Sequence, residues 1–245
     1  MGAQKRAVTS PSRKRKHRGK TARSKATDPK QAVLMAALVH VPFDGFTDTV
    51  LARAADETGV PRTELRRLFT DGPLSLIAAF SEWADGEMLG EIATRDLSAL
   101  KIRERITLAV KIRIAVLKPH KESARRAAAF LLLPPHAPMG VKLLYRTVDA
   151  IWRGIGDTST DFNFYSKRAI LSGVYSTTLM RWFSDATADE KETHEFLRRR
   201  IDDVMRFEKF KAQIRERAGA LPSLSDILNP GDRRAGSRRS KAKSA

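Results

Sequence analysis

The sequence predicts an all-α fold. Apolar residues recur three and four positions apart from Lys30 to Ile214, and Pro and Gly interrupt this helical periodicity. The sequence lacks a sustained alternation of β-branched and polar residues bounded by hairpin turns, which is the signal of strands. It also lacks any run near 18 apolar residues without a charge, so no segment is expected to span a bilayer.

The first helix is expected to begin after Asp28. Asp28 is a good N-cap, and Pro29 suits the first helical position because its fixed φ is helical and its missing N–H would have no partner there. We expect this helix to end at His40, before a turn over residues 41–45.

The next two helices fit a helix-turn-helix. Thr47 is expected to cap a helix over residues 48–58, and a further helix is expected over residues 62–69. The motif needs a small residue where the helices touch, a Gly in the turn and an apolar anchor, and these are Ala55, Gly59 and Leu65.

This module permits a DNA-binding hypothesis. The second helix would present four donors to phosphates or a guanine edge: Arg62, Thr63, Arg66 and Arg67. Four acidic residues surround them and would repel phosphate: Asp56, Glu57, Glu64 and Asp71. Packing helices with exposed arginines explain the same sequence, and we favour that interpretation.

The remaining helices carry more apolar surface. Six helices are expected. One begins at Leu74, one covers residues 102–117, one ends at Leu133, and one covers residues 141–152. The last two run from a cap at Thr160 or Asp161 to Phe183, and over residues 189–217. Such stripes form either a solid core or the lining of an apolar cavity, and periodicity does not separate the two. We expect four parts: a basic tail (1–26), the helix-turn-helix module (27–84), a ligand-binding and dimerisation bundle (85–218), and an apolar segment with a basic tail (219–245).

The formal charge of +18 belongs mostly to the tails. Residues 1–26 contain ten Lys or Arg and no acid, and residues 231–245 contain six Lys or Arg and one Asp. Between residues 27 and 230, 30 basic residues stand against 27 acidic ones. The tails are expected to be disordered and either to attract anionic lipid or nucleic acid, or only to solubilise the chain.

Signals of catalysis are missing. The chain has no Cys, and the sequence contains no Gly-x-Ser-x-Gly elbow, phosphate-binding loop or dinucleotide fingerprint. No Glu-x-x-His pair occurs, so Glu192, His194 and Glu195 are interpreted as a solvated helix face and not as half of a di-iron site. We expect no catalysis, no metal and no cofactor.

Three segments resemble a known family. Residues 131–138 (LLLPPHAP), 147–152 (TVDAIW) and 156–171 (GDTSTDFNFYSKRAIL) are similar to the lipid-binding accessory proteins of coenzyme Q (ubiquinone) biosynthesis, the ninth protein in the naming of that pathway. The Ser-Thr-Asp-Phe-Asn-aromatic-Tyr run is the specific part. The resemblance extends from about Lys30 to Ile214.

The resemblance implies a fold like that of TetR-type regulators, usually dimeric, whose ligand-binding half is an apolar pocket for isoprenoid quinone intermediates. It implies a non-enzyme that presents the quinone precursor to a di-iron demethoxyubiquinone hydroxylase at the membrane. The residues expected to contact lipid are Ile106, Val110, Leu117, Phe130, Leu132, Leu144, Val148, Trp152, Ile170 and Val174.

The partner-facing patch of the family is carried over to Asp161, Phe164, Tyr165 and Arg168. Exposed aromatics beside an Asp and an Arg suit a binding hot spot. The alternatives are an N-cap role for Asp161 and ordinary packing for Phe164 and Tyr165. Phe164 stands where many relatives have Trp, which keeps the apolar face and loses the indole donor.

The C-terminal region departs from the family. Better-known members continue with an amphipathic helix that enters the membrane, whereas here residues 221–230 read LPSLSDILNP before the basic tail. A short anchor of Leu221, Leu224, Ile227 and Leu228 together with the basic tail would serve instead, because one weak apolar contact plus a polybasic patch holds a protein on anionic lipid.

The leading hypothesis is a peripheral lipid-binding protein in a bacterial cytoplasm, with the mitochondrial matrix side of the inner membrane as the alternative location. The alternatives in function are a TetR-type transcription regulator with an apolar ligand pocket, and a helical bundle that binds a protein partner without lipid.

Overall fold

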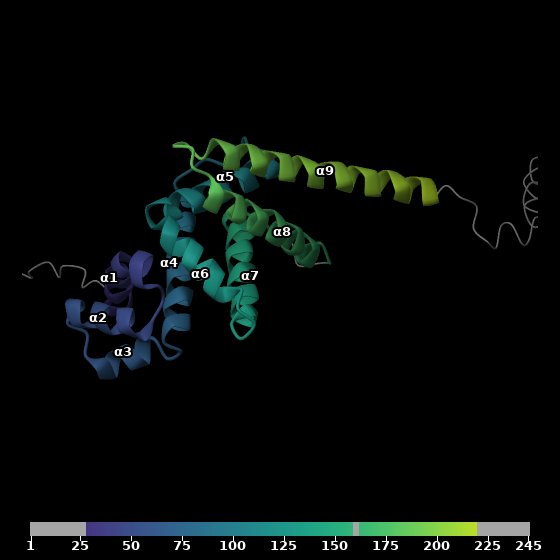
Figure 1. The fold of residues 1–245 in the computed structure, drawn as a ribbon. Coiled ribbons are helices and arrows are strands. Elements are labelled where there is room, and N and C mark those ends of the chain that lie inside the picture. The colour runs from purple at the N-terminus through teal and green to yellow at the C-terminus, as the bar shows by residue number, and fades with distance from the viewer. Residues whose placement is uncertain (1–27, 159–161, 220–245) are drawn as a thin grey trace, which may run out of the picture.

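The computed structural model describes residues 28–158 and 162–219, with side chains given for 28–158 and 164–206. These residues form helices and no strand, which confirms the predicted all-α class. The helices are α1 (Pro29–Asp44), α2 (Asp48–Thr58), α3 (Arg62–Leu68), α4 (Pro73–Ala93), α5 (Ile102–Leu117), η1 (Lys118–His120), α6 (Lys121–Leu131), α7 (Ala137–Gly154), α8 (Phe162–Ser184) and α9 (Lys191–Gly219) (Figure 1).

Helix α1 begins where the sequence predicts and ends later. The Asp28 carboxylate accepts a hydrogen bond from the backbone N–H of Lys30 at 3.1 Å, and Pro29 opens the helix. The predicted end at His40 is wrong, because the helix continues through Pro42 to Asp44. A proline in the last turn costs one backbone hydrogen bond, and burial of the α1 face against the core offsets that cost.

Helices α2 and α3 form the predicted helix-turn-helix. The Thr47 hydroxyl caps α2 by accepting from the N–H of Val50 at 3.2 Å. Gly59 ends α2 with φ of +69°, in the left-handed region that favours glycine. Ala55 and Leu65 are both buried, as a contact between the two helices requires.

Helix α4 joins the N-terminal helices to the rest of the molecule. It packs on α1 and α2 and also on α5 and α7 (Figure 1). The division expected between residues 84 and 85 therefore falls inside one continuous helix, and one apolar core extends over both sides of it.

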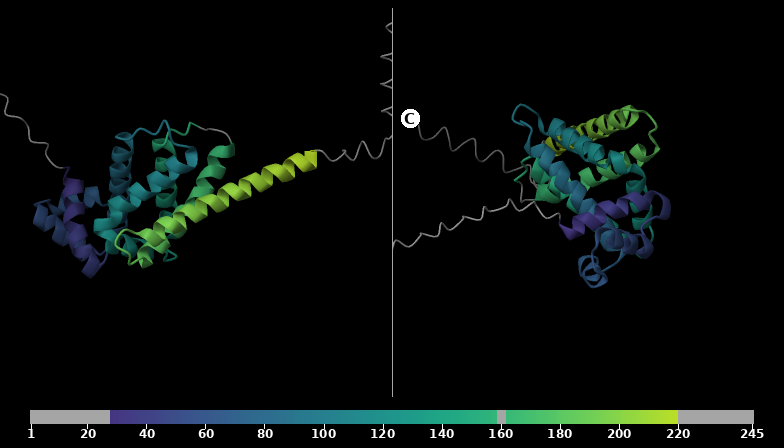
Figure 2. Two further views of the ribbon diagram at one scale, coloured as in Figure 1. Left: turned by 90° about the horizontal axis from the view of Figure 1, so that it is seen from above. Right: turned by 90° about the vertical axis from the view of Figure 1, so that its left-hand side faces the viewer.

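Helices α5 to α8 form the larger half. Helix α7 packs against α4, α5, α6 and α8, so it lies at the centre of this half. Helix α9 packs on α5 and α8, and Figure 2 shows that its later turns extend beyond the body of the bundle.

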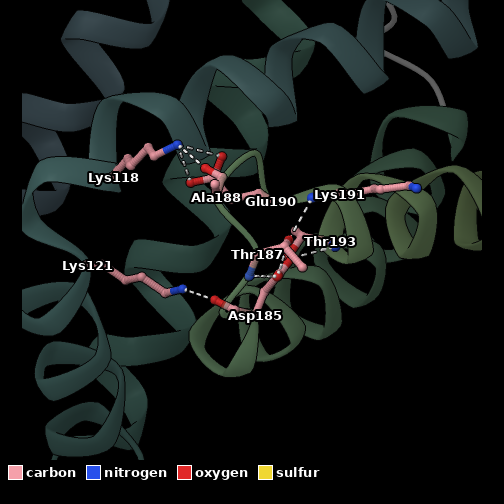
Figure 3. Close-up of polar contacts among 8 residues, drawn as sticks. All are labelled: Lys118, Lys121, Asp185, Thr187, Ala188, Glu190, Lys191 and Thr193. Carbon is pink, nitrogen blue, oxygen red and sulfur yellow. Dashed lines mark hydrogen bonds and ion pairs between the residues drawn. The ribbon is translucent and has the colours of Figure 1, made fainter.

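A polar corner fixes the turn between α8 and α9. The Asp185 carboxylate accepts from the N–H and hydroxyl of Thr187 (2.9 and 2.6 Å) and from the N–H and hydroxyl of Thr193 (2.8 and 2.7 Å). The ammonium groups of Lys118 and Lys121 donate to backbone carbonyls of the same turn, at 3.0 and 2.6 Å (Figure 3). This corner therefore ties α9 to the junction of α5 and α6.

Candidate functional site

An apolar cavity of about 340 Å³ lies in the larger half, between α4, α5, α6, α7 and α8. The inward face of α6 carries the small residues Ala124, Ala127 and Ala128. These methyl groups leave room between α6 and its neighbours that longer side chains would fill. The rest of the lining is Ile77, Phe80, Ser81, Arg113, Leu117, Leu131, Leu132, Ala137, Gly140, Val141, Leu143, Leu144, Thr147, Tyr175, Leu179 and Met180.

One wall of the cavity is polar and deeply buried. Arg113 on α5 donates from Nε to the Asp85 carboxylate at 2.8 Å and from Nη2 to the Ser81 carbonyl at 3.2 Å. The Thr147 hydroxyl on α7 donates to the other oxygen of Asp85 at 3.0 Å. Burial raises the pKa of Asp85, whereas Arg113 and Thr147 oppose that rise by charge and hydrogen bonding.

The lining of the cavity also includes apolar side chains that are exposed at the surface. Leu132 and Val141 both contribute to the lining, yet they are 72% and 68% exposed. Leu133 and Met180 are exposed beside them. Large exposed apolar side chains grouped at a cavity entrance are typical of a binding site. We call these four residues the apolar rim.

Three of the residues expected to contact lipid line the cavity: Leu117, Leu132 and Leu144. The other seven lie outside the lining. Six of them are in the core or packed against it (Ile106, Val110, Phe130, Val148, Trp152 and Val174), and Ile170 is half-buried. Sequence reasoning missed the alanines of α6 and the polar wall. Small residues give no hydrophobic signal, and the polar wall brings together side chains from three helices, α4, α5 and α7.

The residues expected to contact a protein partner are not equivalent. Tyr165 is 66% exposed, Phe164 is half-buried, and the two rings meet edge to face at 5.1 Å. Arg168, which was carried over as part of the partner-facing patch, is 2% exposed, so its side chain is not available at the surface of this chain. Asp161 lies outside the described residues.

Arg168 connects α8 to α7. Its Nε donates to the Asp149 carboxylate at 2.8 Å, and its guanidinium carbon lies 3.4 Å from the centre of the Phe164 ring. An Nη1–Oδ2 contact of 3.6 Å joins it to Asp157. Arg168 thus positions the aromatic pair.

Neither a metal centre nor a spanning helix is found in the described part of the chain. Residues 28–158 and 162–219 contain no group of three His, Asp or Glu placed to hold a metal ion. None of the helices in these residues is long and apolar enough to cross a membrane.

The fold and the cavity define a TetR-like helical protein with an apolar pocket in its larger half. The crystal structure of the TetR transcriptional regulator from Nitrosomonas europaea is similar, with a TM-score of 0.58 and 21% sequence identity, over 71% of this chain and 97% of that one. At this identity the likeness shows the fold alone. Residues 137–208 match the COQ9 family model, so this part of the chain is similar to the COQ9 family.

Known proteins match the chain over a longer stretch than the family model does. The chain is 32% identical over 201 residues to the rat ubiquinone biosynthesis protein COQ9, mitochondrial, which covers 77% of this chain and 62% of the relative. The human protein of the same name is 31% identical over 201 residues, covering 77% of this chain and 61% of the relative. The chain therefore spans about three fifths of these relatives, and the family resemblance recognised in the sequence is confirmed.

Proposed function

We propose that this chain is a non-catalytic lipid-binding protein of ubiquinone biosynthesis that holds isoprenoid quinone intermediates in the apolar cavity. The observation that carries the proposal is a cavity lined by alanine, leucine, phenylalanine and methionine that reaches the surface at the apolar rim. The names of its relatives supply the pathway.

The size of the cavity suits part of such a ligand. Ligand pockets span roughly 300–1,000 Å³, and this cavity is near the lower limit. A quinone ring and the beginning of an isoprenoid chain fit this volume. The rest of the chain would leave through the rim, where Leu132 and Val141 replace water around it.

Native mass spectrometry of the purified full chain tests lipid binding. We expect co-purifying isoprenoid lipid with the native sequence and its loss with Ala128→Phe, because the added ring occupies the cavity. Ala129 is the matched control, since it is the next residue of α6 and is exposed. Repeatedly empty native protein, or equal occupancy in Ala128→Phe and Ala129→Phe, would count against the cavity as the lipid site.

We also propose that the surface around Phe164 and Tyr165 receives a di-iron demethoxyubiquinone hydroxylase. The exposed Tyr165 packs on the half-buried Phe164, which the buried Arg168 holds, and such a preorganised contact lowers the ordering cost of binding. Tyr165→Ala is expected to weaken hydroxylase binding in a pull-down or titration at least tenfold. The exposed Tyr145→Ala serves as control. Intact affinity in Tyr165→Ala would remove this surface from the proposal.

Attachment to an anionic membrane surface and a homodimeric state complete the proposal. The membrane would be a bacterial inner membrane or, since the relatives are named mitochondrial, the mitochondrial inner membrane, which we propose the chain would meet from its matrix side. Flotation with liposomes of anionic and of neutral lipid tests attachment. Full-length protein should float with anionic liposomes at low salt, and deletion of residues 231–245 or 1–26 should reduce this. Flotation independent of both tails would assign the contact to the folded part.

A further inference from the structure

The polar wall of the cavity contains donors that the protein itself does not use. Arg113 is 3% exposed, and a guanidinium offers five N–H donors. Nε and Nη2 are engaged by Asp85 and Ser81, whereas the buried Nη1 donates to no acceptor among the described residues. Leaving a buried donor of a charged group without an acceptor costs free energy. A ligand that supplies an acceptor atom to this donor would recover that cost.

Tyr175 adds a second unused group to the same wall. It is 5% exposed, lines the cavity, and its hydroxyl takes part in no hydrogen bond within the described part of the chain. Tyr175 and Arg113 line the same cavity, and the charges of Arg113 and Asp85 both act on the pKa of Tyr175. Burial raises the pKa of Tyr175, which keeps the phenol neutral and able to donate.

The charge of the wall restricts the kind of acceptor. Asp85 neutralises Arg113 through a 2.8 Å contact, and the Tyr175 phenol is uncharged, so the wall has no net charge. A carboxylate or phosphate placed here would add an uncompensated charge in the interior, next to the Asp85 carboxylate. A neutral oxygen, such as a carbonyl or a phenol, accepts the free donors without that penalty.

We infer that Arg113 and Tyr175 hydrogen-bond an uncharged, oxygen-bearing head group and thereby orient an amphipathic ligand with its head at the polar wall and its apolar tail at the rim. This rests on the proposed function, because it takes the cavity to be the lipid site. It adds the chemistry of the head group and the direction of insertion. The rim residues Leu132, Val141 and Met180 would then contact the tail.

Calorimetric titration of the full chain with three probes that share a decyl tail tests the inference. The probes are decyl-benzoquinone (neutral oxygens), decylbenzene (no oxygen) and 4-decylbenzoate (anionic). We expect the quinone to bind at least about tenfold more tightly than either of the others, the difference that one net hydrogen bond in a dry site supplies. Tyr175→Phe should remove about tenfold from quinone affinity and leave decylbenzene affinity unchanged.

Two controls separate the outcomes. Tyr145→Phe removes a phenol oxygen outside the cavity and should change neither affinity. Arg113→Lys keeps the charge opposite Asp85 and removes donors, so a preserved circular dichroism spectrum with weaker quinone binding supports the same assignment. Equal binding of quinone and decylbenzene, unchanged in Tyr175→Phe, would overturn the head-group inference and leave lipid binding intact. Binding of no probe would overturn both.

Discussion

Arg168 and Arg153 bind the same carboxylate, that of Asp149, and differ in exposure. Each guanidinium Nε lies 2.8 Å from an Asp149 oxygen, but the side chain of Arg168 is 2% exposed and that of Arg153 is 70% exposed. Breaking a buried ion pair costs about 3–5 kcal/mol, and an exposed one is worth about 0–1 kcal/mol. Arg168→Ala should lower the unfolding free energy by about 3 kcal/mol and Arg153→Ala by less than 1 kcal/mol, measured by urea denaturation.

This pair also tests what Arg168 does for the surface patch. Arg168 acts on the patch through Phe164, because its guanidinium packs on that ring. In Arg168→Ala the affinity for the hydroxylase should decrease, and the rings of Phe164 and Tyr165 should become less ordered, which NMR would detect as altered ring resonances. Equal destabilisation by Arg168→Ala and Arg153→Ala would contradict the role assigned to burial.

At the scale of the element, Asp185 fixes the first turn of α9 although it lies before that helix in the chain. Its carboxylate accepts hydrogen bonds from the N–H and hydroxyl of Thr193. Burial alone would raise the pKa of Asp185, but the hydrogen bonds from Thr187 and Thr193 outweigh it and hold the pKa well below its ordinary value. Its contribution to stability is therefore present above the ordinary carboxyl pKa and is lost as the pH falls through that value toward the folded-state pKa.

The Asp185 corner yields a prediction for α9. Asp185→Asn should lower stability at neutral pH, because one amide group cannot accept from donors on both sides. The difference in unfolding free energy between native and Asp185→Asn protein, measured by urea denaturation, should narrow as the pH falls from 7 to about 3.5, because the carboxylate gains protons in the unfolded chain while it stays ionised in the folded one. Asp189→Asn, an exposed change in the same turn, is the control, and a gap independent of pH would refute the assignment.

Element boundaries show where sequence reasoning succeeds. Helix α2 was predicted at both ends, because the Thr47 hydroxyl and the φ of Gly59 each act on the adjacent backbone. The sequence did not decide between a solid core and a cavity, because that outcome depends on which side chains of different helices meet. Ala128 contributes to it by being small, and Tyr175 contributes a hydroxyl that helical periodicity assigns to the core.

The charge of a residue also failed to predict its burial. An arginine in a polar sequence is expected at the surface, yet Arg113 and Arg168 are both buried because each meets a carboxylate on another helix. Such pairs lie 28 and 19 positions apart in the chain. Local sequence patterns do not report contacts at that separation, and the polar wall of the cavity contains one of these pairs, Arg113 and Asp85.

At the scale of the whole molecule, α4 makes the N-terminal helices and the larger half one cooperative unit. A single apolar core extends from Leu34 in α1 through α4 to Ile151 in α7. Leu34→Ala should therefore cost about 2–5 kcal/mol for the entire fold and lower the hydrogen-exchange protection of α7 amides by the same free energy. Calorimetry should show one transition at a lower temperature. If the amides around Ile151 keep their protection while those of α1 lose it, the helix-turn-helix module unfolds separately, and α4 does not couple it to the cavity.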